Sequence, residues 1–95
     1  MSALTLKIIS PEGASQIVGC DSVTLWMAPD VNGKGEGSIG IRKGHTDAVI
    51  ALGSGPVHAH LDGNEAFSAK SEGGFATVLH DTVTIVTPKI MRNEK

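Results

Sequence analysis

The sequence is poor in cysteine and has no long apolar run. Cys20 is the only cysteine among 95 residues, which excludes an internal disulfide and indicates a reducing compartment. No apolar segment approaches the roughly 20 residues that cross a bilayer. Residues 1–5 lack the charged and apolar regions of a signal peptide. We therefore expect a cytoplasmic protein that is attached to a membrane, if at all, through a partner and without direct insertion.

Neither positive nor negative charge is in clear excess. Lys and Arg together number 8 against 10 for Asp and Glu, which gives a formal net charge of -2, and no block of like charge occurs. Nucleic-acid and acidic-lipid binding both depend on clustered positive charge. The composition therefore predicts no nucleic-acid partner.

The length limits the chain to one domain. A chain of this size buries only about 60–65% of its unfolded surface, so one compact core is expected and a deep active-site cleft is not. We expect residues 1–88 to form this domain and residues 89–95 to form a short charged tail.

The distribution of apolar residues predicts an all-β fold. Leu4, Leu6 and Ile8 alternate with Thr5 and Lys7, the two-residue period of a half-buried strand, and no window of a dozen residues has a helical period. Turn residues recur at roughly the 8–12-residue spacing of a sandwich, including residues 62–64 and 80–81. We expect a single Gly-rich antiparallel β-sandwich of about eight to ten short strands. They are expected at residues 4–9, 15–20, 22–27, 38–42, 47–52, 57–61, 66–70, 75–79 and 82–87.

Two histidines on one strand suggest a metal site. His58 and His60 alternate with apolar residues, so both imidazoles can lie on one face and reach one metal ion. Together with Glu65 they approximate the first motif of the cupin family, but its spacing is off and its second motif is missing. A small cupin-like metal-binding enzyme is the alternative hypothesis. The simpler interpretation places both histidines on the solvent side of the strand, so we expect no bound metal.

Other catalytic patterns are weak. Residues 33–37, rich in glycine with one lysine, precede a strand, whereas a phosphate loop must precede a helix. No Gly-x-Ser-x-Gly elbow is present. Cys20 has no adjacent cation and is expected to fill space in the core. We therefore expect a non-catalytic protein with no cofactor and no small-molecule substrate.

The strongest pattern is a glycine motif, Gly37, Gly40, Ile41, Gly44 and His45. With it come a first strand that ends in Ser-Pro-Glu-Gly, the segment Gly-Pro-Val at residues 55–57, and Glu-Gly-Gly-Phe at residues 72–75. In this order, the motifs resemble the amino-terminal β-sandwich of the epsilon subunit of F-type ATP synthases, over nearly the whole chain. The form resembled is a short one, without the family's helical hairpin, and residues 26–35 are longer than the family's usual link.

The resemblance implies a rotor-stalk subunit that links the gamma subunit to the membrane rotor ring and couples proton transport to ATP synthesis. Such a protein would be peripheral on the cytoplasmic face of the membrane. By motif position, Ser10, His45 and Ile50 are expected on the gamma side. Glu36, Gly37 and Ser38 are expected at the ring end.

Residues 47–52 are almost wholly apolar, which indicates cover on both faces of their strand. This pattern adds a physical reason to expect Ile50 at a partner interface.

Overall fold

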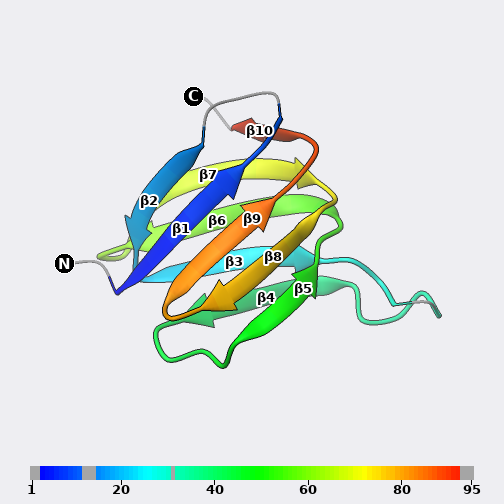
Figure 1. Cartoon of the computed structure of the whole chain (residues 1–95), viewed down its shortest axis with the longest axis horizontal. Coiled ribbons are helices and arrows are strands. Elements are labelled where there is room, and N and C mark those ends of the chain that lie inside the picture. Colours follow the sequence, from blue (N-terminus) through cyan, green and yellow to red (C-terminus); the bar gives the residue numbers. More distant parts are fainter. Residues whose placement is uncertain (1–2, 12–14, 31, 93–95) are drawn as a thin grey trace.

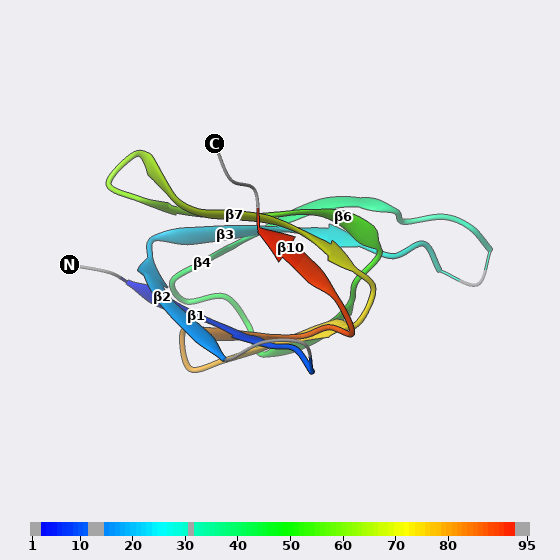
Figure 2. The same cartoon turned by 90° about the horizontal axis from the view of Figure 1, so that it is seen from above.

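In the computed structural model, which describes residues 3–11, 15–30 and 32–92, two five-stranded sheets pack face to face (Figures 1 and 2). One, here called the β1 sheet, has the strand order β2-β1-β9-β8-β5. The other, called the β6 sheet, has the order β10-β7-β6-β3-β4. The ten strands are β1 (Leu4–Ile9), β2 (Gln16–Cys20), β3 (Ser22–Met27), β4 (Gly37–Arg42), β5 (Ala48–Ala51), β6 (Ser54–Leu61), β7 (Asn64–Glu72), β8 (Phe75–Leu79), β9 (Thr82–Val86) and β10 (Ile90–Arg92). The all-β sandwich predicted from the sequence is confirmed.

Strand pairing is antiparallel except between β1 and β9, which run parallel from Thr5 opposite Thr82 to Ile9 opposite Val86. Figure 1 shows the β1 sheet in front of the β6 sheet. In the view of Figure 2, β2 and β10 slant between the two layers.

The core lies between the inner faces of the two sheets. Along β1 the buried residues are Leu4, Leu6 and Ile8, as the alternation predicts. The β6 sheet contributes the buried residues of β3, β4, β6 and β7 in the same way. The full set is Leu4, Leu6, Ile8, Cys20, Val23, Leu25, Ile41, Ile50, Leu52, Val57, Ala59, Phe67, Ala69, Ala76, Val78, Val83 and Ile85.

Two tight hairpins use residues with positive φ. Asp62 and Gly63, with φ of 53° and 79°, join β6 to β7, and His80 and Asp81, with φ of 50° and 57°, join β8 to β9. Two successive positive φ values define the turn whose twist matches that of antiparallel strands. Both turns lie where the sequence predicts them.

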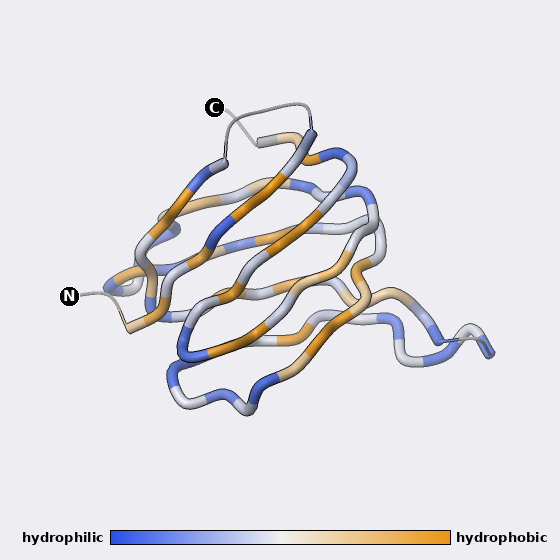
Figure 3. The backbone as a smooth tube through the Cα atoms, in the orientation of Figure 1, coloured by the Kyte–Doolittle hydropathy of each residue, from blue (hydrophilic) through white to orange (hydrophobic). Residues whose placement is uncertain are grey.

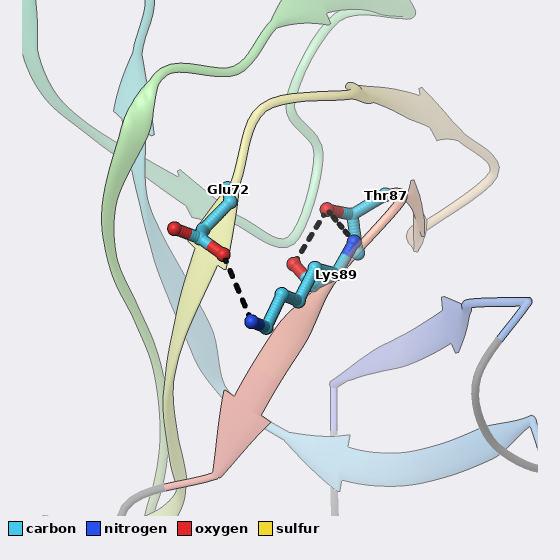
Figure 4. A network of polar contacts seen from close by, with 3 residues as sticks. All are labelled: Glu72, Thr87 and Lys89. Carbon is cyan, nitrogen blue, oxygen red and sulfur yellow. Dashed lines mark hydrogen bonds and ion pairs between the residues drawn. The ribbon is translucent and has the colours of Figure 1, made fainter.

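The predicted tail differs from what the structure shows. Residues 90–92 form β10, which pairs with β7 from Ile90 opposite Ser71 to Arg92 opposite Ala69. Figure 4 shows the crossover to this strand: the Thr87 hydroxyl donates to the Lys89 carbonyl at 3.0 Å, and Lys89 Nζ lies 3.8 Å from Glu72 Oε2. The pattern of residues 88–92 is too short for periodicity to reveal the strand, which depends on pairing with distant β7. A domain boundary at residue 88 stays a prediction.

The connection from β3 to β4 projects beyond the sandwich (Figure 2) and is mostly hydrophilic (Figure 3). Asp30 organises it: its Oδ1 accepts hydrogen bonds from the backbone N–H groups of Asn32 and Lys34, at 2.8 and 2.9 Å. This projection contains most of the glycine-rich residues 33–37, which lead into strand β4 as the sequence predicts.

Candidate partner-binding site

The outer face of the β1 sheet is apolar and nearly uncharged. Among the described residues, five of the six exposed large hydrophobic side chains belong to this sheet, and the five strands contain a single charged residue, Lys7. The exposed apolar residues are Ile9, Ile17, Val49, Phe75 and Leu79. Threonines opposite one another, Thr5 with Thr82 and Thr77 with Thr84, fill much of the remainder. An apolar face of this kind on a small domain is typical of a protein-binding surface.

A shallow open hollow of about 430 Å³ lies on this side of the molecule, along β5 and β8. Val49, Thr77 and Leu79 line it together with Asp47, Ala48 and Val78. Val49 is 75% exposed, the largest fraction among the exposed large hydrophobics. The hollow therefore gives the apolar face a concave part that can receive a partner's side chain.

Ile50, predicted on the gamma side, points into the core and is only 8% exposed. The β5 segment is apolar on both sides, as the sequence indicates, but its two sides differ: Ile50 faces the core, whereas Val49 and Ala51 face outward. The sequence reveals that both sides are apolar without revealing which residue lies outside. The outward group that a partner can contact directly on this strand is Val49.

Ser10 and His45 lie at opposite ends of the β1 sheet. Ser10 follows Ile9, at the end where Val86, Phe75 and Ala51 are paired across the sheet. His45 precedes β5 at the other end, where the Gly44 N–H donates to Asp81 Oδ1 at 2.9 Å. The three predicted gamma-side residues do not form one cluster. Ser10 and His45 mark the two ends of the apolar face, and their role in binding stays a prediction.

The predicted ring-end residues are contiguous in space as well as in sequence. Glu36 ends the projecting loop, and Gly37 and Ser38 begin β4, where they pair with Met27 and Trp26. Glu36 Oε2 accepts a hydrogen bond from the Trp26 indole Nε1–H at 3.1 Å. The structure thus adds Trp26, which sequence reasoning overlooked, to this end of the molecule. Its being the only tryptophan is the signal that could have drawn attention to it, since tryptophan is enriched at interfaces.

The outer face of the β6 sheet is polar. His58 and His60 share it, with ring centroids 6.4 Å apart, and His58 Nδ1 lies 3.1 Å from Glu65 Oε2 and 3.2 Å from Ser68 Oγ. These contacts engage the Nδ1 atom of His58 within the sheet. No group of three or more His, Cys, Asp or Glu suited to a metal ion occurs among the described residues. The histidines occupy the half-exposed side of β6 while Val57 and Ala59 fill the core, as the simpler interpretation expects.

Cys20 lies at the end of β2 with its side chain in the core. Burial, and secondarily the negative charge of Asp21, raises the pKa of this thiol. A raised pKa reduces the thiolate fraction, so Cys20 has the character of a core residue, as expected.

The residues that the structure describes include no helix with the length and apolarity needed to cross a membrane.

Comparisons with known proteins agree with these observations. The family model described as ATP synthase, delta/epsilon chain, β-sandwich domain matches residues 3–93. The ATP synthase epsilon chain of Micrococcus luteus is 34% identical over 85 residues, which cover 90% of this chain and 86% of that one. That of Lawsonia intracellularis is 35% identical over 85 residues, but the match covers only 58% of the relative's length.

Solved structures share the fold. A chain in the mitochondrial ATP synthase of Euglena gracilis (OSCP, F1 and c-ring) superposes with a TM-score of 0.69 at 20% identity, covering 94% of this chain and 52% of that one. A chain in the central stalk and c-ring of the Tetrahymena thermophila enzyme gives a TM-score of 0.64 at 14% identity, covering 95% and 66%. At these identities the likeness establishes the sandwich alone.

Proposed function

Because the chain belongs to the family of ATP synthase delta/epsilon-chain β-sandwich domains, we propose that it is a non-catalytic subunit of the central stalk of an F-type ATP synthase. In this role it links the gamma subunit to the membrane rotor ring and couples proton transport to ATP synthesis. It is peripheral, on the cytoplasmic face of the membrane, through these partners. The family match also replaces the cupin-like alternative built on His58, His60 and Glu65.

The observation that carries the proposal is the apolar outer face of the β1 sheet. Binding a partner there removes Ile17, Val49, Phe75 and Leu79 from water and leaves few charges to be desolvated, namely Lys7 on β1 and Asp47 at the hollow. Burial of apolar groups is favourable at roughly 25 cal/mol per Å², whereas burial of unpaired charges is costly. We assign this face, with Ser10 and His45 at its ends, to the gamma subunit. Ile50 lies beneath this face, in the core, where it packs behind β5.

The ring end is a second surface, which adjoins the apolar face at Val49 and Ala51 of β5. The projecting loop and Glu36, Gly37 and Ser38 lie at the end of the molecule where Ala51 of β5 accepts a hydrogen bond from the Ala28 N–H at 2.9 Å. An apolar face and a polar end allow one rigid sandwich to contact two partners at once. To transmit torque between these partners the domain must be stiff, and two closely packed sheets provide that stiffness.

A matched pair of threonines tests the assignment of the gamma face. Thr77 lies on the outer face of the β1 sheet between Val49 and Thr84, and Thr24 lies on the outer face of the β6 sheet between Gly40 and His58. Both are half-buried. We expect Thr77→Glu to weaken binding to purified cognate gamma subunit at least tenfold, about 1.4 kcal/mol, because the carboxylate must be desolvated at the interface. Thr24→Glu should change the affinity less than twofold.

The measurement is a calorimetric titration with gamma, and thermal melts establish that both variants are folded. Equal binding by a folded Thr77→Glu variant would exclude this face. A larger loss for Thr24→Glu would move the gamma site to the β6 sheet. Absence of binding by the wild-type chain would contradict the stalk function itself.

A further inference from the structure

The single tryptophan is bound to a carboxylate at the proposed ring end. The Trp26 indole N–H donates to Glu36 Oε2 at 3.1 Å, across the pair formed by β3 and β4. Glu36 is otherwise an exposed residue at the end of a projecting loop. Indole is a donor only and an ionised carboxylate is an acceptor only, so the hydrogen bond has one possible sense. The contact therefore fixes one oxygen of Glu36 and leaves Oε1 for a partner.

Glycines on the neighbouring segment make room for the indole. A Cβ added at Gly55 would lie 2.6 Å from Trp26 Cβ and nearer still to the ring, and one at Gly53 would lie 3.3 Å from Trp26 Cδ1. The Gly53 N–H also donates to the Trp26 carbonyl at 3.0 Å. Any larger side chain at Gly55 would displace the ring. The position of the indole, and with it that of Glu36, is thus set by the backbone at Gly53, in the β5–β6 connection, and at Gly55, near the start of β6.

A fixed carboxylate binds more tightly than a mobile one. Immobilising a flexible side chain on binding reduces affinity by about two- to tenfold, a cost that is avoided when the side chain is already held. Hydrogen bonds between a carboxylate and a cationic or N–H donor are among the stronger ones in proteins. A carboxylate held at the polar end of the sandwich can therefore recognise a donor on the ring.

We infer that Trp26 is a positioning residue: it holds Glu36 in the orientation that accepts a lysine, an arginine or another N–H donor from the membrane rotor ring. The inference rests on the proposed function and deepens it. Trp26 acts through Glu36 and makes no essential contact with the ring itself.

A double-mutant cycle tests this coupling. Trp26→Phe removes the indole donor and keeps an aromatic ring, and Glu36→Gln removes the charge and keeps the size. Each variant and the double variant, bound to purified gamma subunit, are titrated with purified cognate rotor ring in lipid nanodiscs. We expect each single variant to weaken ring binding about two- to tenfold and the double variant to be no weaker than Glu36→Gln alone. Glu65→Gln, a matched change near the other end of the β6 sheet, should have no effect.

A second measurement reads the contact without the ring. Because Trp26 is the only tryptophan, the protein gives one indole N–H resonance by NMR. We expect Glu36→Gln to move it upfield and to speed its hydrogen exchange, and Glu65→Gln to leave it in place. Gly55→Ala, which displaces the ring without removing its N–H, should weaken ring binding as Trp26→Phe does. The Gly55→Ala variant replaces Trp26→Phe in the test if Trp26→Phe does not fold.

The outcomes separate the inference from the proposed function. If the wild-type chain does not bind the ring, the proposed function fails and the inference fails with it. If the wild type binds and Glu36→Gln weakens it, but Trp26→Phe has no effect or adds fully to Glu36→Gln, the inference alone is overturned. An unmoved indole resonance in Glu36→Gln, or unchanged ring binding in that variant, also overturns the inference while the stalk function stands.

Discussion

The two outer faces of the sandwich differ although the two inner faces are alike. Outside the β1 sheet lie threonines and exposed aliphatic and aromatic side chains with a single lysine, Lys7. Outside the β6 sheet lie His58, His60, Glu65 and Lys70. Both sheets obey the same alternation and contribute to the same core. Folding does not require the apolar outer face of the β1 sheet, because polar side chains could face water there as they do on the β6 sheet.

The difference instead separates two kinds of contact. A face with almost no charge can be covered broadly by another protein at little desolvation cost, whereas a polar face remains stable in water and makes local contacts through particular groups, as Glu36 does beside Trp26. In the proposed function, the apolar face and the polar end serve two different partners.

The largest effect is expected from neighbouring residues of β5. Ile50→Asp places an unpaired carboxylate in the core and should lower the free energy of unfolding by about 4 kcal/mol or more. Val49→Asp, one residue earlier and 75% exposed, should lower it by about 1 kcal/mol or less and instead weaken gamma binding at least tenfold. Urea denaturation gives the stabilities, and calorimetry gives the affinity. Similar stabilities for the two variants would contradict the orientation of β5.

An intermediate effect tests the equivalence of the inner faces. Leu6 in the β1 sheet and Leu25 in the β6 sheet are both 0% exposed. We expect Leu6→Ala and Leu25→Ala each to cost about 2–5 kcal/mol of stability, because each leaves a cavity in the shared core. The loss of stability is measured from the midpoints of urea unfolding, provided that the dependence of the unfolding free energy on urea concentration is unchanged. A cost below about 1 kcal/mol in either sheet would show that the sheet contributes little to the core.

The smallest effect is expected on the polar outer face. His58 and Glu65 are 31% and 44% exposed at the side chain, so water screens their interaction. Glu65→Ala should therefore cost about 0–1 kcal/mol of stability and leave gamma binding unchanged. Thermal unfolding measures the stability cost. Lys70→Ala, another exposed change on the same face, is the control. A loss above about 2 kcal/mol would indicate that the outer polar contacts stabilise the sheet more than surface pairs usually do.

Local pattern was sufficient for most of the fold. The alternation of Leu4, Leu6 and Ile8 predicts which side of β1 is buried, and the turn residues at 62–64 predict the β6–β7 hairpin. The strand that the sequence did not reveal is β10, with three residues and no periodicity of its own. A short strand at a sheet edge is stabilised by its neighbour, which lies far away in the sequence.

The candidate site was predicted less completely. The glycine motif around His45 led to the family, and the apolar segment at residues 47–52 led to β5. The choice of Ile50 as the outward residue does not agree with its burial, since an apolar strand has no alternation to reveal its orientation. Trp26 gave no motif at all, because its significance comes from Glu36, ten residues away, and from the glycines below it.

The sequence by itself determined the class of fold, the positions of nearly all strands and the family, because each depends on residues close together in the chain or on their order. The tertiary structure alone decided which side of β5 faces outward, which exposed residues share one apolar face, and that Trp26 holds Glu36. Each of these depends on strand pairing and sheet packing, which bring together residues from distant parts of the chain.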